Sequence, residues 1–203
     1  MPFAYSTQSD DKTVAVWQLT ETVDELQALL PFTDAYHNEF ALLKSDKRKK
    51  EFLAVRILLQ HLLPDAPSME YHATGKPYLT DFSYFISVSH TQGYAAVCIS
   101  LHEEVGVDIE RKSEKIHRVK HKFLHADEVD YANEHPNFVL LAWGVKEAVY
   151  KKIGETVVDF SKSIYIHPVV VQNKGQVHVH IVPSDIGYIF YYQAHADYVL
   201  VYG

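Results

Sequence analysis

The hexapeptide "VGVDIE", residues 105–110, places two carboxylates inside an otherwise apolar run. Successive side chains of a β-strand point to opposite faces, so the three apolar residues share one face and Asp108 and Glu110 share the other. Two acids on one face repel each other unless a positive charge lies between them. The stretch therefore predicts either the solvated edge strand of a sheet or half of a site for a hard divalent cation such as Mg²⁺ or Mn²⁺.

The composition is that of a globular protein. The chain has 203 residues, of which 47% are hydrophobic and 13% aromatic, and it can bury one sizeable core or two small ones. No apolar run reaches the length of a membrane span, and the first ten residues, "MPFAYSTQSD", lack the basic-then-apolar order of a signal peptide. A single cysteine, Cys98, excludes a disulfide framework. We expect a cytoplasmic monomer with no membrane contact.

The charge is unevenly distributed along the chain. A net charge of −7 argues against a general nucleic-acid binder. Of the 19 basic residues, many fall in two runs, "KSDKRKK" at 44–50 and "RKSEKIHRVKHK" at 111–122. Such runs on an acidic protein indicate either a phosphate-bearing or acidic partner, or merely solvated helix faces.

The hydrophobic spacing predicts a similar order of elements in the two halves of the chain. In the first half it predicts a strand at 13–19, helices at 23–32 and 40–63, a turn at 75–78, and strands at 83–90 and 94–101. In the second half it predicts a strand at 105–110, a mixed segment at 112–135, a helix from Asn137 to Gly154, and strands at 163–171, 176–182, 187–194 and 197–203, with "NKG" at 173–175 as a hairpin turn. We therefore predict an α+β fold of two similar halves, 1–103 and 104–203. Each would be a long helix packed on a small antiparallel sheet, and pseudo-two-fold symmetry would relate them.

The helix "NFVLLAWGVKEAVYKKIG", residues 137–154, carries the next polar group. Its apolar stripe is formed by Phe138, Leu141, Ala142, Val145, Ala148 and Val149. Trp143, Glu147, Tyr150 and Lys151 fall on the other side. Glu147 and Lys151 are four residues apart, which is also the spacing of an ordinary surface ion pair. A tryptophan one turn before them is unusual on a solvated face and indicates a lined cleft.

Four motifs of the chain resemble those of the 4′-phosphopantetheinyl transferases. "VGVDIE" and "WGVKEAVYK" are similar to the two signature motifs G-[IV]-D-[IV]-E and W-x-x-K-E-A-x-x-K. "GKPY" and "FISVSH" resemble two motifs of the larger, two-domain class, which activates peptide and polyketide synthetases. All four occur in order within about residues 45–154. The chain departs from the pattern in "SHT", where many members have Ser-His-Ser, and in "GETVVDF", where many have Gly-x-Gly-Leu.

The resemblance implies an enzyme that depends on Mg²⁺, with Mn²⁺ as a substitute. It would move phosphopantetheine from coenzyme A to a serine of an apo acyl or peptidyl carrier protein and release 3′,5′-ADP. Asp108, Glu110 and Glu147 would bind the metal, and Glu147 would also take the serine proton, directly or through water. Lys151 would offset charge on the phosphate oxygens. Lys146 is expected to point at the same phosphates.

The resemblance assigns the other end of coenzyme A to the first half of the chain. Its 3′-phosphate and adenine would be bound by Arg56, Lys76, Ser89 and His90, and cationic and hydroxyl donors suit a dianion. The basic run 111–122 follows Glu110 directly. We therefore expect it at the rim of the site, where it would dock the acidic helix of a carrier protein.

Two other classes of protein are weighed against this enzyme. One is a catalytically silent relative that binds a nucleotide or a carrier protein, although the presence of three carboxylates and Lys151 argues against it. The other is a metalloprotein that uses the pair His178 and His180 or the pair His121 and His125. The sequence supplies no evident third ligand for either pair.

Overall fold

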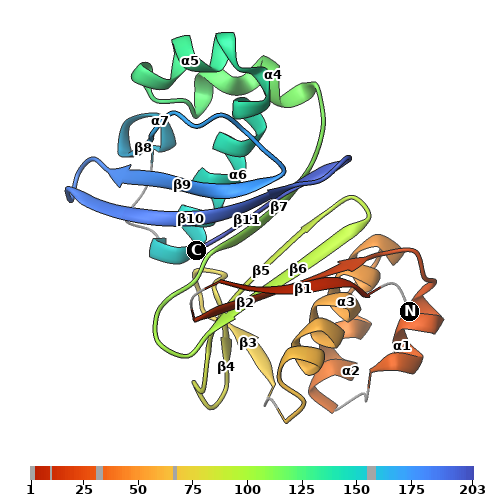
Figure 1. Ribbon diagram of the computed structural model, residues 1–203. Coiled ribbons are helices and arrows are strands. Elements are labelled where there is room, and N and C mark those ends of the chain that lie inside the picture. Colours follow the sequence, from red (N-terminus) through yellow and green to blue (C-terminus); the bar gives the residue numbers. More distant parts are fainter. Residues whose placement is uncertain (1–2, 10, 31–33, 66–67, 155–158) are drawn as a thin grey trace. The chain divides into compact units, whose positions relative to one another are not determined.

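The structure is a computed structural model that describes residues 3–9, 11–30, 34–65, 68–154 and 159–203 (Figure 1). The chain divides into two compact units, Met1–Glu103 and Glu104–Gly203. Each unit combines helices with an antiparallel sheet, which confirms the α+β class. The two-fold relation between the halves stays a prediction. No helix in the described part of the chain is long and apolar enough to cross a membrane.

The first unit is built on a four-stranded antiparallel sheet. The strands lie in the order β1 (Phe3–Ser9), β2 (Lys12–Gln18), β6 (Tyr94–Ser100) and β5 (Phe85–Thr91). Between β2 and β5 the chain forms α1 (Val23–Leu29), α2 (Asp34–Ala41), α3 (Asp46–Leu62) and the small hairpin sheet of β3 (Met69–Tyr71) and β4 (Pro77–Leu79). The buried side of α3 shares its core with β2 and β6, through residues such as Leu53, Leu58, Ala15 and Val97.

The single helix predicted over 40–63 is wrong, because the structure has two helices there. The helix α2 ends at Ala41 and α3 begins at Asp46. Ser45 caps the second helix, since its side-chain oxygen accepts the backbone N–H of Arg48 at 3.3 Å. Apolar residues continue at helical spacing across this break, so periodicity alone does not locate it.

The second unit is built on a five-stranded antiparallel sheet. The strands lie in the order β7 (Val107–Arg111), β11 (Tyr198–Tyr202), β10 (Ile186–Ala194), β9 (Lys174–Ile181) and β8 (Ile164–Ile166). Between β7 and β8 the chain forms α4 (Lys115–Val119), the 3₁₀ turns η1 (Lys120–Lys122) and η2 (Ala126–Glu128), α5 (Val129–Glu134), α6 (Pro136–Ile153) and α7 (Phe160–Ser163). The helix α6 covers one face of the sheet (Figure 1).

The hairpin turn predicted at 173–175 is also wrong. Lys174 and Gly175 belong to β9, where Gly175 pairs with Tyr192 of β10. A Cβ atom on Gly175 would lie 2.8 Å from the Tyr192 ring, so this glycine makes room for an aromatic side chain. The predicted strand at 163–171 shortens to β8, which ends two residues before Pro168.

The same pattern of strand pairing occurs inside each unit. In each unit the strand that precedes the helices pairs antiparallel with the unit's last strand, β2 with β6 in the first unit and β7 with β11 in the second. In each unit the longest helix, α3 or α6, packs against that strand pair. The first strand of each pair is therefore joined to a segment far along the chain.

Candidate active site

Strand β7 holds Asp108 and Glu110 on the face that α6 covers. Their partners on β11 are Val201 and Val199, and both valines belong to the hydrophobic core beneath α6. Asp108 is only 3% exposed. The interpretation of "VGVDIE" as a solvated edge strand is therefore excluded, although β7 does lie at one end of the sheet order.

The helix α6 directs its polar side toward these carboxylates. All six residues of the predicted apolar stripe are fully buried, which confirms the orientation of the helix. The indole N–H of Trp143 donates to Glu110 Oε1 at 2.9 Å. The Lys151 ammonium donates to Asp108 Oδ1 at 2.8 Å and to the Val107 carbonyl at 2.9 Å. Side chains of α6 thus contact both acids of β7.

Gly106 lets the helix lie directly against the start of β7. A Cβ atom on Gly106 would lie 1.9 Å from the carbonyl oxygen of Ala148, far inside van der Waals contact. One turn earlier, a Cβ on Gly144 would lie 3.5 Å from Asp108 Oδ2. The close approach of the two backbones therefore brings the Asp108 carboxylate beside the middle of α6.

The negative charges of Asp108 and Glu110 act on Glu147. Burial raises the pKa of Glu147 to about 7, and the negative charges of Asp108 and Glu110 contribute in the same direction while Lys151 opposes them. Burial and the charge of Asp108 also raise the pKa of Glu110, against the Trp143 hydrogen bond and Lys151. Lys151 thus offsets part of the repulsion among the three carboxylates.

The chemistry of this donor set suits a hard divalent cation, because a cation would offset both the burial of the charges and their mutual repulsion, which raise these pKa values. The side chains are not preassembled around one. Among the described residues, no group of three or more His, Cys, Asp or Glu side chains is placed to hold a metal ion. The acids of β7 are instead engaged by Lys151 and Trp143. Asp108, Glu110 and Glu147 stay the predicted ligands.

The histidine pairs weighed as a rival metal site gain no further ligands within the described ranges. His180 Nε2 lies 3.3 Å from Asp185 Oδ1. His125 Nδ1 accepts the backbone N–H of Asp127 at 3.3 Å and so caps η2. His125 therefore has a structural role at this turn.

Lys146 does not point at the three carboxylates, contrary to the prediction. Its side chain is fully buried and its ammonium forms an ion pair with Glu128 at 2.8 Å. Residues 146 and 147 are consecutive on α6, so their side chains leave the helix about 100° apart. Periodicity could not reveal this pair, because its acidic member lies in the short turn η2. We therefore leave Lys146 out of the phosphate site.

In the first unit, Arg56 and His90 line the same cavity, which has a volume of about 350 Å³. Arg56 is 2% exposed, forms an ion pair with Glu39 and lies 3.3 Å from the ring centroid of Phe52. Arg48 also lines the cavity, with Nη1 3.3 Å from His90 Nε2. The sequence interpretation missed Arg48, because it counted this residue only as part of a basic run.

The other two residues predicted for this end of coenzyme A are not among the described residues that line the cavity. Ser89 is buried in β5. Lys76 lies in the turn between β3 and β4 and is partly exposed.

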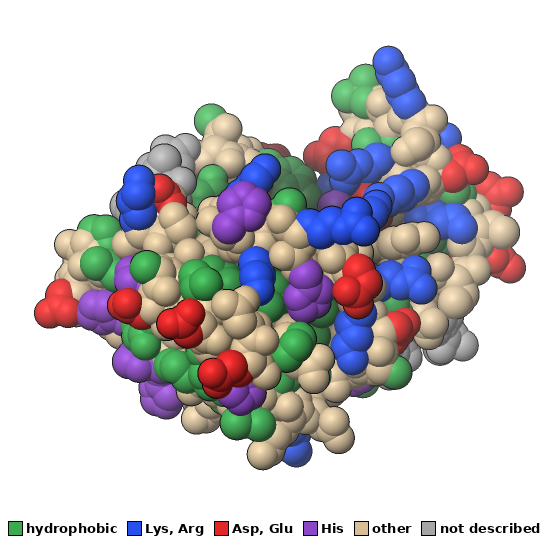
Figure 2. All heavy atoms as spheres, turned by 90° about the horizontal axis from the view of Figure 1, so that it is seen from above, with side chains coloured by type: hydrophobic (Ala, Val, Ile, Leu, Met, Phe, Trp, Pro, Cys, Tyr) green, Lys and Arg blue, Asp and Glu red, His purple; other side chains and the backbone are tan. Residues whose placement is uncertain are grey.

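The basic run 111–122 forms the end of β7, then α4 and η1. Figure 2 views the molecule from the side on which α4 and α5 lie in Figure 1, and Lys, Arg and His side chains are prominent there. A cavity of about 380 Å³ adjoins the run and is lined by Lys112, His117, Asn137 and His195, among others. Residues 155–158 of "GETVVDF" lie outside the described residues.

Residues 104–202 match the family model described as "4'-phosphopantetheinyl transferase superfamily". The match covers nearly all of the second unit, including β7, α6 and four of the predicted site residues, Asp108, Glu110, Glu147 and Lys151. It supports the superfamily that the two signature motifs indicated, whereas the larger two-domain class stays a prediction. No curated protein matches the chain.

Proposed function

We propose that the protein transfers 4′-phosphopantetheine from coenzyme A to a serine of an apo acyl or peptidyl carrier protein, with 3′,5′-ADP as the second product. One observation carries the proposal. Lys151 of α6 donates a hydrogen bond to Asp108 of β7, and the charges of Asp108 and Glu110 help raise the pKa of buried Glu147, inside the segment that matches a family of phosphopantetheinyl transferases.

The chain's own residues would supply the acid–base chemistry. A serine hydroxyl is a weak nucleophile and needs a positioned base, and Glu147 of α6 is the carboxylate that we assign to that role. Glu147 would take the serine proton as the oxygen attacks the β-phosphorus. The bond from that phosphorus to the bridging oxygen would then break, and 3′,5′-ADP would leave with the electron pair.

Lys151 would stabilise the charge that develops on the phosphate oxygens. Its ammonium already donates to Asp108 and to the Val107 carbonyl, which fixes it beside the carboxylates. Mg²⁺ held by Asp108, Glu110 and Glu147 would neutralise the pyrophosphate.

The nucleotide end of coenzyme A would bind to the first unit. The cavity lined by Arg48, Arg56 and His90 supports this assignment, because it gathers two guanidinium groups and an imidazole. Glu39 and Glu51 also line it and pair with these groups, so a bound phosphate would exchange with carboxylates. Lys76 and Ser89 are also proposed to bind this end of coenzyme A, and only the motif resemblance supports them. The basic run 111–122 is proposed to dock the carrier protein in the cytoplasm.

The test of this function is a transfer assay. Purified protein, coenzyme A and an apo carrier protein should yield a carrier heavier by one phosphopantetheine group when Mg²⁺ or Mn²⁺ is present. Chelation by EDTA should stop the reaction, and readdition of metal should restore it. Binding of coenzyme A without any transfer to several unrelated carriers would indicate the silent relative instead.

The variants Lys76→Ala and His90→Ala test the nucleotide assignment. A charge-assisted hydrogen bond contributes about 1.5–3 kcal/mol, so each variant should weaken coenzyme A binding by roughly ten- to a hundredfold. Binding of dephospho-coenzyme A, which lacks the 3′-phosphate, should stay within about threefold of wild type, since it never made those bonds. Calorimetric titration with both ligands measures this. An equal loss for the two ligands would remove these residues from the 3′-phosphate site.

A further inference from the structure

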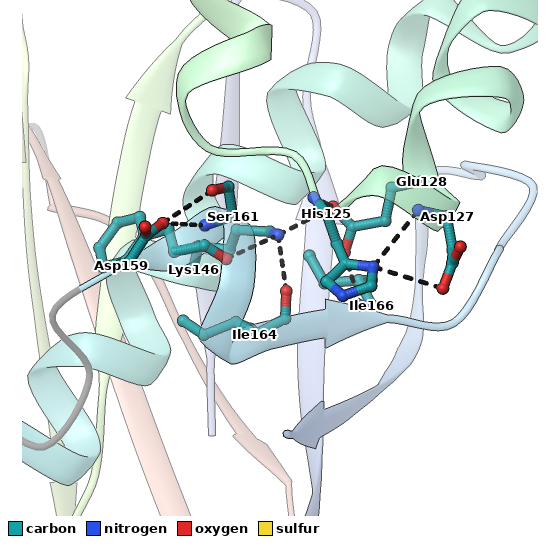
Figure 3. Close-up of polar contacts among 9 residues, drawn as sticks. His125, Asp127, Glu128, Lys146, Asp159, Ser161, Ile164 and Ile166 are labelled. Atoms are coloured by element: carbon teal, nitrogen blue, oxygen red, sulfur yellow. Dashed lines mark hydrogen bonds and ion pairs between the residues drawn. The ribbon is translucent and has the colours of Figure 1, made fainter. Parts of the chain in front are cut away.

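Lys146 of α6 and Glu128 of η2 form a buried ion pair. Both side chains are fully enclosed, and the Lys146 ammonium lies 2.8 Å from Glu128 Oε2. The ammonium also donates to the carbonyl of Ile164 at 2.8 Å and to that of Phe160 at 3.3 Å. Figure 3 shows Lys146 reaching between Glu128 and Ile164. An ammonium has three N–H donors, and the structure uses all three inside the protein.

Glu128 is satisfied in the same way. Its Oε2 accepts the backbone N–H of His125 at 2.8 Å, and its Oε1 accepts the backbone N–H of Ile166 at 2.7 Å. Buried ions are tolerated when they are paired and hydrogen-bonded to this extent, and removal of one partner leaves an uncompensated charge. The pair therefore holds one specific arrangement of its neighbours.

These contacts tie α6 to three other segments. Glu128 belongs to η2, Ile164 and Ile166 belong to β8, and Phe160 begins α7. On another side of α6, Lys151 and Trp143 hold the helix to β7. Glu147 follows Lys146 directly and lies between Trp143 and Lys151 in the sequence. A change at the buried pair would rotate or shift α6 and carry Glu147 with it.

We propose that Lys146 and Glu128 are positioning residues whose buried ion pair fixes α6 against η2 and β8, and so fixes Glu147 relative to Asp108 and Glu110. The inference rests on the proposed function, because Glu147 is the base and metal ligand of that function. A displacement of about 1 Å at a reacting group can cost roughly 10²-fold in rate. Partners that orient metal ligands from behind typically contribute about 10–100-fold in affinity or activity.

Two other roles for Lys146 make different predictions. If it were a phosphate ligand, its loss would raise KM for coenzyme A whatever residue stood at position 128. If the pair merely stabilised the fold, its loss would lower the melting temperature but leave the site of the folded protein unchanged.

The experiment compares Lys146→Met, Glu128→Gln and the double variant. A Trp17→Phe background leaves Trp143 as the single tryptophan, and its indole contacts Glu110 at 2.9 Å. Quenching of its fluorescence then gives the Kd for Mn²⁺ without any turnover. The steady-state kcat and the KM for coenzyme A are measured on the same proteins. Val177→Ala, a buried change in β9 of the same core, is the control for lost stability alone.

Each single variant should lower kcat and weaken Mn²⁺ by about 10–100-fold, with KM for coenzyme A within about twofold of wild type. The double variant leaves no uncompensated buried charge but still lacks the ion pair, so its kcat and Mn²⁺ affinity should lie between those of the single variants and those of wild type. If the double variant had a raised KM for coenzyme A, Lys146 would be a phosphate ligand and the proposal would be overturned. Single variants that behave like Val177→Ala would overturn it too. Wild-type protein that binds Mn²⁺ but transfers nothing would contradict only the proposed function.

Discussion

Glu147→Gln is expected to lower the rate of phosphopantetheine transfer by at least about 10²–10⁴-fold, which is the usual contribution of a general base. The substitution keeps the size of the side chain but removes its ability to accept a proton, and it replaces a charged metal ligand with a neutral one. Single-turnover transfer to an apo carrier protein, followed by mass spectrometry, measures the loss. Glu134→Gln, an exposed change on α5, is the control. Near wild-type turnover in Glu147→Gln would contradict the mechanism.

The same variant should be more stable than the wild type in metal-free solution at pH 8. The folded pKa of Glu147 is raised from 4.5 to about 7, so the folded state binds this proton more tightly than the unfolded state. This group's contribution is therefore most favourable below pH 4.5, declines as pH rises toward 7 and is constant above it. Each pKa unit is worth about 1.4 kcal/mol before solvent screening, so we expect a gain of about 1–3 kcal/mol.

Urea unfolding in EDTA at pH 8 and at pH 4.5 tests this sign. The advantage of Glu147→Gln should be present at pH 8 and should largely vanish at pH 4.5, where the wild-type carboxyl is protonated in the folded state. A variant that is less stable than wild type at both pH values would show that Glu147 is held as a favourable charge in the absence of metal.

Gly106→Ala should destabilise the second unit by about 3 kcal/mol, at the upper end of the usual cost of overpacking. The added methyl would lie 1.9 Å from a backbone carbonyl of α6, so the helix itself has to move away from β7. Such a movement separates Glu147 and Lys151 from Asp108, and transfer activity should be lost with the stability.

Gly187→Ala is the matched control for this change. It adds the same methyl to a glycine of the same sheet, where the nearest atom would lie at an ordinary 3.9 Å. Urea midpoints and transfer rates of the two variants should differ clearly. If Gly106→Ala unfolded at the urea concentration of Gly187→Ala, α6 would not lie against β7 as described.

Local patterns in the sequence were enough to predict the core of the candidate site. The period of two in "VGVDIE" predicted that Asp108 and Glu110 share a face, and the helical stripe of residues 138–149 predicted which side of α6 is buried. Both follow from backbone geometry that acts over a few residues. The β7–α6 contact itself depends on Gly106, whose role becomes visible only when the two backbones are placed.

The remaining features depend on contacts that no local pattern encodes. Lys146 has the polarity of a surface residue, yet Glu128 and two carbonyls enclose it. Arg56 is buried by stacking on Phe52 and pairing with Glu39. Gly175 of "NKG" does not form a turn but leaves room for the Tyr192 ring. In each case a tertiary partner, and not the residue's own propensity, determines the environment.

The pairing of β7 with β11 has a consequence for how the site is made during protein synthesis. In the described sheet, the strand that carries Asp108 and Glu110 has β11 as its neighbour, and Gly106 and Gly203 exchange two backbone hydrogen bonds at 2.8 and 3.0 Å. A nascent chain that stops short of residue 198 contains every candidate catalytic residue but leaves β7 unpaired. Such long-range strand pairing is slow compared with helix formation. The ribosome must therefore release the segment 198–203 before a nascent chain can assemble this site.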